Sequence, residues 1–305
     1  MILPTPSIVH AASVDRATML GKDIFVRGYT IGGGIFATSV IRHLEKGFRA
    51  IMTESAAYSI RNDLDEVKQV GIEVSRGEEP PEGFNGEVLD IGEVNLKELD
   101  GFLSKKNVTL SDVDVMAIAV QDHGASPKGM SNRKFRIEKM REQLSRRRRP
   151  EDFAFKEDEV PKYLIRMNSA VRASKSQFPN SKVVVADTSI AAISGCLQDS
   201  AVAEEESVLA VNLGNGHTMA AIILKGEICG IVEHHTRLLT YNRLERLLRD
   251  FADGELVDED VFNEGGHGVA FAKKPPSFSK IGLIAATGPN RHLIEKAGVE
   301  AHFAA

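Results

Sequence analysis

Cysteine is scarce in this chain, which has only Cys196 and Cys229 among its 305 residues. Two cysteines 33 positions apart exclude a disulfide framework, a four-cysteine zinc site and a three-cysteine iron–sulfur motif. A metal site in this protein must therefore use histidine and carboxylate ligands, and we expect no iron–sulfur cluster.

Long apolar runs and a large excess of one charge are also missing. No span of 18 apolar residues occurs, so we expect no membrane-spanning helix. The N-terminal MILPTPSIVHAAS lacks a cationic region followed by an apolar core, which argues against a secretory signal. The net charge of −5 and the pI near 6.0 argue against nucleic-acid or anionic-membrane partners. The sequence predicts a cytoplasmic protein.

Strand and helix patterns alternate along the chain and predict an α/β fold. Ile24–Gly28 reads as a buried strand, followed by a glycine loop, a helix over Ile35–Lys46 and a second strand over Arg49–Thr53. Such a βαβ unit favours a parallel sheet with the loop at a ligand-binding edge. Further helices are expected at Asp63–Val70, Leu96–Lys105, Asn132–Pro150, Val160–Gln177, Ser189–Leu197 and Tyr241–Phe251, and further strands at Val113–Val120, Lys182–Ala186 and Ile281–Ala286.

A charged stretch, Asn132–Pro150, marks the middle of the chain. It predicts a boundary between an N-terminal lobe, 1–150, and a C-terminal lobe, 151–305. One interpretation is a solvated helix neutralised by the acid-rich segment that follows it. The alternative is that Arg133, Lys134 and Arg136 meet anionic charge at the rim of a site.

The stretch Val208–Thr236 contains the most informative pattern. A short apolar run, a turn at Asn212–Gly216 and two β-rich runs predict a three-stranded meander. Backbone amides of the GNGHT turn can form an anion-binding nest, although a plain hairpin with solvated histidines has the same pattern. The residues expected to hold a phosphate group or cofactor at this turn are Gly214, Asn215, Gly216 and Thr218.

Five of the nine histidines lie in four short motifs beside predicted strands or glycine turns. Neutral imidazole binds divalent transition metals, and a histidine near pKa 6.5 can act as acid or base. Without an HExxH helix, a metal site must be assembled from loops distant in sequence. The candidate catalytic residues are His123, His217 and Asp122. The candidate metal ligands are Asp187, Glu233, His234, His235 and His267.

Other loops also suit a phosphate group. We expect Gly32, Gly33 and Gly34 to form a second anion-binding loop, and Gly288 to open a helix whose N-terminus favours negative charge. Asp187 ends a strand before a helix, where it can be an ordinary helix cap or can hold Mg²⁺ through its waters.

The order of these motifs resembles the superfamily of actin, heat-shock chaperones and sugar kinases. The resemblance rests on DTSIAAISG, VNLGNGHTMAAII and AATGPNRHLIE, covers the C-terminal part of the chain, and implies two ribonuclease H-like lobes with mixed sheets flanked by helices. It also implies an ATP site. Asn212 stands where many members have an acid, a departure from the standard magnesium-bound site.

A second resemblance is nearly chain-long. It rests on the motifs GYTIGGG, TESAAYSI, QDHGASPKGMSNRKFR, VADTSIAAISGC, NLGNGHT, EHHT, GGHG and ATGPNR. In these motifs the chain is similar to the family called domain of unknown function 1786, whose members often carry the label of pyruvate formate-lyase activating enzyme. Such an activase needs three closely spaced cysteines, so we expect a different activity. Members begin with an Asp-Gly-Thr phosphate hairpin where this chain has MILPTPS, so the resemblance predicts a lobe without that hairpin.

Three hypotheses follow from these patterns. The first is a phosphotransferase or phosphohydrolase that binds a nucleotide or small phosphorylated ligand, with ATP and Mg²⁺ or another divalent metal as cofactors, in a cleft between the lobes. The second is a histidine-centred metallohydrolase that does not use ATP. The third is a non-catalytic binding or assembly module.

Overall fold

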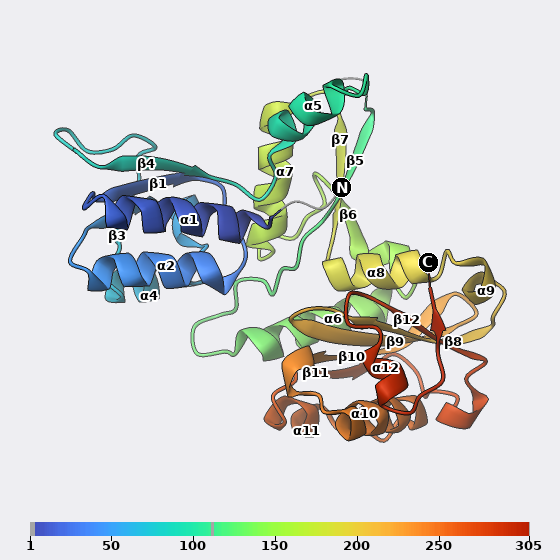
Figure 1. The fold of residues 1–305 in the computed structure, drawn as a ribbon. Coiled ribbons are helices and arrows are strands. Elements are labelled where there is room, and N and C mark those ends of the chain that lie inside the picture. Colours follow the sequence, from blue (N-terminus) through green and yellow to red (C-terminus); the bar gives the residue numbers. More distant parts are fainter. Residues whose placement is uncertain (1–3, 111–112, 305) are drawn as a thin grey trace. The chain divides into compact units, whose positions relative to one another are not determined.

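The protein is described by a computed structural model covering residues 4–110 and 113–304 (Figure 1). It divides into two compact units, one comprising Met1–Lys128 with Lys156–Val185, the other Gly129–Phe155 with Ala186–Ala305. The sequence predicts a single boundary near residue 150. The division differs because the charged helix α6 (Asn132–Arg146) packs its buried side chains into the core of the second unit. Each unit is described here by itself.

The first unit contains a four-stranded parallel sheet in the order β3-β2-β1-β4. The predicted βαβ unit is confirmed: β1 (Ile24–Gly28) and β2 (Ala50–Thr53) flank α2 (Gly34–Glu45). Every pairing of this sheet is parallel, whereas the resemblance to actin-like lobes predicts a mixed sheet. The other elements of this unit are α3 (Glu54–Ala57), α4 (Leu64–Gln69), β3 (Glu73–Ser75), β4 (Glu87–Ile91), α5 (Leu96–Ser104), β5 (Val115–Ala119), α7 (Ile165–Gln177) and β7 (Lys182–Ala186), whose last residue belongs to the second unit.

An N-terminal helix, α1 (Pro6–Met19), was absent from the sequence-based expectations. Its buried Ser7 hydroxyl accepts a hydrogen bond from the amide of Phe36 at 3.2 Å and donates to the carbonyl of Gly33 at 3.1 Å. The first turn of α2 has no cap from its own N-cap residue. Ser7 therefore satisfies one of the free N–H groups that every helix start exposes.

The second unit is built on a six-stranded sheet in the order β11-β10-β9-β8-β12-β13. Strands β8 (Ser207–Leu213), β9 (His217–Leu224) and β10 (Glu227–His235) are antiparallel neighbours, so the predicted meander is confirmed. Strand β12 (Leu283–Thr287) runs parallel to β8. The remaining elements are η1 (Pro150–Phe153), β6 (Ala154–Lys156), whose last residue belongs to the first unit, α8 (Thr188–Cys196), α9 (Ser200–Ala203), η2 (Thr236–Leu238), α10 (Tyr241–Asp253), α11 (Asp258–Asn263), β11 (Gly268–Phe271), η3 (Phe278–Lys280), α12 (Leu293–Lys296) and β13 (His302–Phe303).

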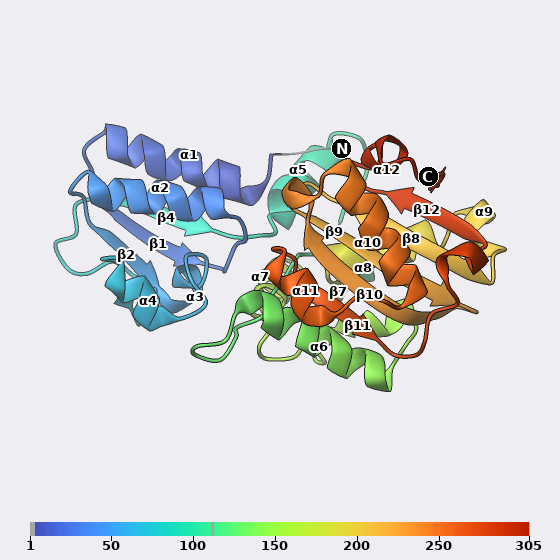
Figure 2. The same cartoon turned by 90° about the horizontal axis from the view of Figure 1, so that it is seen from below.

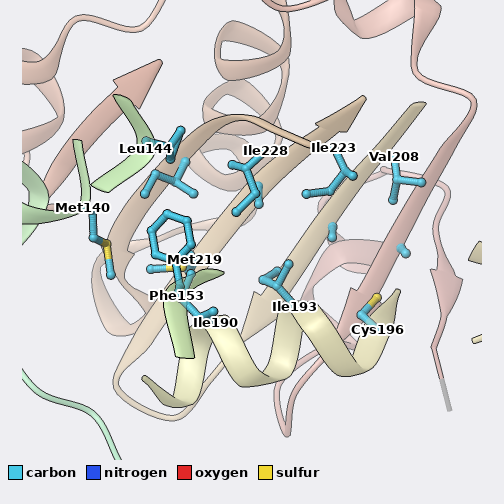
Figure 3. Close-up of a cluster of buried hydrophobic side chains, with 14 of the residues drawn as sticks. Met140, Leu144, Phe153, Ile190, Ile193, Cys196, Val208, Met219, Ile223 and Ile228 are labelled. Atoms are coloured by element: carbon cyan, nitrogen blue, oxygen red, sulfur yellow. The ribbon is translucent and has the colours of Figure 1, made fainter. Parts of the chain in front are cut away.

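Both faces of this sheet are buried, each under different helices. Alternate side chains point to opposite faces of a strand, and α6 and α8 cover one face while α10, α11 and α12 cover the other (Figure 2). Figure 3 shows the α6/α8 face, where Met140, Ile190 and Ile193 pack on Met219 and Val208 of the strands. We name these the α6/α8 face and the α10/α11 face.

The C-terminal glycine turn differs from its prediction. The helix expected to begin at Gly288-Pro289 begins only at Leu293 and has four residues. Gly288 has a φ of +94°, and a Cβ there would lie 2.6 Å from the carbonyl oxygen of Leu213. Glycine is needed because the turn passes directly against the end of β8, and not because it starts a helix.

In the described part of the chain, we find no helix that combines the length and the apolar character needed to cross a bilayer.

Candidate functional site

One edge of the second unit's sheet gathers most of the predicted site residues. Strands β8 and β12 end there at Leu213 and Thr287, β10 ends at His235, and β9 begins at His217. Ligands of open α/β sheets bind beyond the carboxyl ends of strands. The topology therefore places the glycine turn and the EHHT and GGHG motifs at the edge where a ligand is expected.

Three histidine side chains meet at this edge, and we name them the histidine cluster: His217, His235 and His267. His217 and His235 are opposite each other on β9 and β10. The amide of His267, which directly precedes β11, donates to the carbonyl of Glu233 at 2.9 Å. Ring centroids lie 4.7 Å apart for His217 and His235, and 4.9 Å apart for each ring with His267.

Burial favours the neutral state of the imidazoles in this cluster. Burial, the largest cause, lowers the pKa of His267 to about 2, and the nearby Arg136 guanidinium lowers it further. Burial also lowers the pKa of His217 and of His235. A ligand-capable nitrogen of His217 lies within 4.8 Å of one of His267. His217 and His267 therefore offer nitrogens close enough together for a shared metal ion, and imidazole binds such an ion in its neutral form.

A buried charged triad lies on the same face of the sheet. Arg136 donates from Nη1 and Nη2 to the two oxygens of Asp187 at 2.8 and 3.0 Å, and from Nε to Glu233 Oε2 at 2.6 Å. All three side chains are at most 6% exposed. The prediction that Arg136 lies at a rim is therefore wrong, because it neutralises two buried acids. We call Arg136, Asp187 and Glu233 the charged triad.

The two acids of the triad differ in their remaining contacts. Asp187 Oδ1 also accepts from the amide of Ser189 at 2.9 Å and so caps α8, as one of the two interpretations of this residue predicts. Glu233 Oε1 is buried and has no hydrogen-bond partner among the described residues. A buried acceptor without a partner is costly, so Glu233 retains an oxygen for a ligand that the protein itself does not supply.

His234 is separated from the cluster. It follows Glu233 and precedes His235 on β10, so its side chain points to the α10/α11 face while theirs point to the α6/α8 face. Its Nδ1 lies 3.2 Å from the carbonyl oxygen of His235, and burial lowers its pKa. The prediction grouped His234 with His235 as ligands of one metal, and the alternation of side chains along the strand rules out that grouping.

The glycine turn is tied to its surroundings through the backbone of Gly214. The amide of Gly214 donates to the carbonyl of His217 at 2.9 Å, so this amide is committed to the turn itself. Its carbonyl accepts from Thr236 Oγ1 at 2.8 Å and Asn290 Nδ2 at 3.0 Å. Buried Thr218 contacts the Thr236 hydroxyl at 3.0 Å, which gives it a structural contact. The exposed residues of the turn are Asn215 and Gly216.

The glycine loop of the first unit is filled by the protein's own side chains. The amide of Gly32 donates to Glu93 Oε2 at 2.9 Å, and Arg166 pairs with the same carboxylate at 2.6 and 2.9 Å. A Cβ at Gly32 would overlap the Arg166 guanidinium, and one at Gly33 would lie 2.7 Å from Ser7 Oγ. Glycine is required at Gly33, whose φ is +104°, whereas at Gly32 the end of the flexible Arg166 side chain would have to move. A phosphate group at Gly32 would compete with a carboxylate already in place, while Gly34 has open space around it.

Asp122 and His123 follow β5 in the first unit. Asp122 accepts from the amides of Gly124 at 2.8 Å and Met167 at 3.0 Å, and burial raises its pKa. These bonds fix the loop to the start of α7. The catalytic roles assigned to Asp122 and His123 remain predictions.

Sequence reasoning missed the role of two side chains. Asn290, which bonds the glycine turn, belongs to the ATGPNR motif, but the motif assigned no role to this side chain. Arg136 was seen as part of a charged run, yet it lies four residues before Met140 and eight before Leu144, on the apolar side of α6. A lone arginine at the spacing of buried residues is the signal for an internal ion pair.

Comparison with known proteins supports the second resemblance. A search of curated proteins finds no match. A family model described as "Putative pyruvate format-lyase activating enzyme (DUF1786)" matches residues 31–293, which include every motif of the second resemblance except the start of GYTIGGG. The chain therefore belongs to the domain of unknown function 1786 family.

Proposed function

We propose that this protein is a metal-dependent phosphohydrolase or phosphotransferase that holds a divalent transition metal at the histidine cluster. The phosphorylated ligand or nucleotide would bind at the neighbouring glycine turn. The observation that carries the proposal is the convergence of His217, His235 and His267 at the carboxyl edge of the sheet. The pairing of β9 with β10 and the bond from His267 to Glu233 set these three rings side by side, and histidine nitrogens are common ligands of transition metals.

The donor set fits a transition metal better than Mg²⁺. Imidazole nitrogen suits zinc, iron, manganese and related ions, whereas Mg²⁺ prefers oxygen. The unpartnered Glu233 Oε1 offers one oxygen on the same face, for a ligand or for a metal-bound water. When bound, such a metal supplies an activated water and polarises a phosphoryl oxygen. The charged triad then keeps Glu233 oriented through Arg136.

Phosphate binding is supported by the position of the glycine turn. Asn215 and Gly216 are exposed at the carboxyl edge, and Asn290 braces the turn from the segment after β12. Five strands lie in the order β10-β9-β8-β12-β13, and only β9 is antiparallel to the others, an arrangement that agrees with the resemblance to actin-like lobes. This topology supports nucleotide among the phosphorylated ligands.

The cysteines favour histidine chemistry over the activity in the family description. Cys196 lies in α8 against one face of the sheet, and Cys229 points to the opposite face; both are buried. Two thiols separated by a sheet do not form the three-cysteine site of an iron–sulfur activase. We therefore place the reaction at the histidine cluster.

The first experiment measures metal binding. The full chain, stripped with chelator, is titrated with Co²⁺, whose visible absorption reports nitrogen ligation, and with Zn²⁺ and Mn²⁺ by calorimetry. We expect one equivalent to bind, and His217→Ala and His267→Ala each to lower the affinity at least tenfold. His302→Ala is the matched control, because His302 lies on β13 outside the cluster and its side chain is hydrogen-bonded to Asp199. Equal affinities for all variants would refute the metal site.

The second experiment tests the ligand class. Melting temperatures are recorded with metal and with ATP, a non-hydrolysable analogue, sugar phosphates or inorganic phosphate. A ligand that binds only the native state must raise the melting temperature. We expect a metal-dependent shift with at least one phosphorylated compound. One equivalent of metal without any such shift would move the reaction to the metallohydrolase class, and the absence of both would leave a binding module.

A further inference from the structure

The α10/α11 face contains a cavity that the proposed function does not use. It has a volume of about 410 Å³, the size of a small-molecule site. Its walls are β10, α10, α11 and the segment between the two helices. His234 lines it from the sheet, opposite in orientation to the histidine cluster.

His234, which lines this cavity, carries a hydrogen-bond acceptor that the protein does not use. Its Nδ1 is 3.2 Å from the carbonyl oxygen of His235. A carbonyl only accepts, so Nδ1 carries the proton and Nε2 carries the lone pair. Nε2 is buried and has no hydrogen-bond partner among the described residues, and the residue is 1% exposed. A ligand that satisfies this nitrogen must donate a hydrogen bond.

The charge of the cavity favours a cation. Four carboxylates and two guanidinium groups line it. Glu264 accepts from both Arg243 and Arg246, at 2.8 and 3.3 Å, so the two arginines share one carboxylate, and the four acids still outnumber the two arginines. Asp250, Glu255 and Asp260 form no ion pair with any other described residue. A net negative wall attracts cations and repels anions.

The rest of the lining is aliphatic. Leu247 of α10 and Val261 of α11 are buried, and Leu239, Leu256 and Val257 complete the apolar wall. Apolar walls with a few convergent polar groups are typical of small organic ligands, which gain affinity from the carbons as well as from the polar end. A bare metal ion would leave this wall without a partner.

We propose that this cavity is a second binding site, which takes a small aliphatic amine whose ammonium donates to His234 Nε2 and is attracted by the unpaired carboxylates. The site is independent of the metal and phosphate chemistry proposed above. A ligand here contacts β10 directly behind the histidine cluster.

The test compares four-carbon probes that differ only in their polar ends. The full chain, stripped with chelator, is titrated by calorimetry with 1,4-diaminobutane, 1,4-butanediol and succinate. We expect the diamine to bind at least fivefold more tightly than the diol, and succinate not to bind. Equal binding of diamine and diol, no binding of the diamine, or preferred binding of an anion would each overturn the proposal.

Variants locate the site. Asp260→Asn, an exposed change, is expected to weaken diamine binding about threefold to fivefold, the effect of one exposed ion pair. Glu245→Gln is its control, because it neutralises an acid of α10 outside the cavity. His234→Leu removes the acceptor and should weaken binding more. Because this variant can also perturb folding, the ¹⁵N shift of His234 Nε2 in the unaltered chain gives a second measurement. An unchanged shift at saturating diamine refutes the contact, and unchanged diamine binding by His217→Ala separates this site from the metal site.

Discussion

Replacement of Arg136 by methionine tests the charged triad. Methionine keeps most of the apolar volume of the side chain but removes three hydrogen bonds, two to Asp187 and one to Glu233. Two carboxylates would then remain buried without a counter-charge. Breaking a buried ion pair in this way costs about 3–5 kcal/mol.

Lys134→Met is the matched control on the same helix. Lys134 pairs with Glu259 at 2.9 Å, but the side chains are 39% and 59% exposed. An exposed pair contributes about 0–1 kcal/mol and is weakened by salt. The two substitutions thus remove a cation from α6 in environments that differ chiefly in burial.

The measurement is thermal and urea unfolding in chelator, followed by signals from the second unit. A loss of 3–5 kcal/mol in a unit of this size corresponds to a fall in Tm of about 6–20 °C. The triple variant with Arg136→Met, Asp187→Asn and Glu233→Gln should recover part of that loss, because no buried charge remains and asparagine can still cap α8. If Arg136→Met is no more destabilising than Lys134→Met, or the triple variant is no more stable than the single one, the argument from buried charge is wrong.

Three further predictions concern other parts of the fold. Gly288→Ala should destabilise the second unit by about 2–4 kcal/mol in urea titrations, because Gly288 has a φ of +94° and a Cβ there would overlap a backbone oxygen. Gly298→Ala is the control: Gly298 has a φ of +75° but open space around it, so this substitution should cost only about 1 kcal/mol. Burial raises the pKa of Cys196 to about 11 and also raises the pKa of Cys229. A disulfide reagent at pH 8 should therefore label no thiol in the native chain and two thiols after denaturation. Rapid labelling of the native chain would contradict this prediction. Burial lowers the pKa of His43 below 6.5, so the unfolded chain binds a proton at this residue more readily than the folded chain does. The stability that His43 contributes above pH 6.5 should therefore be lost as the pH falls. If the His43→Gln variant has the same pH profile of Tm as the unaltered chain, this residue does not contribute.

Local elements of the fold were largely predictable. The βαβ unit, the meander at Val208–Thr236 and the helix Tyr241–Asp253 follow from apolar periodicity and turn residues, which act over a few positions. Helix α1 was missed because its buried residues are mostly small, several of its large apolar residues are exposed, and it packs on α2 and β4, which are distant in sequence. The expected helix at Gly288 was wrong because the turn is shaped by contact with β8, which is distant in sequence.

The sequence predicted which residues gather at the candidate site better than it predicted how their side chains are arranged. Glycine turns and strand ends correctly indicated His217, His235 and His267 as neighbours at one edge. The separation of His234 from His235 follows from strand alternation, but only after β10 is known to extend through both residues. The buried position of Arg136 depends on how α6 lies on the sheet, which no local pattern encodes.

The sequence by itself determined the family, the α/β class, the scarcity of thiols and the set of histidine motifs, because these depend on composition and short-range pattern. The tertiary structure decided which histidines share a face, which acids are neutralised by Arg136 and which glycines are required by close packing. These properties depend on contacts between segments far apart in the chain. The face of β10 on which a side chain lies is what separates the proposed metal site from the proposed amine site.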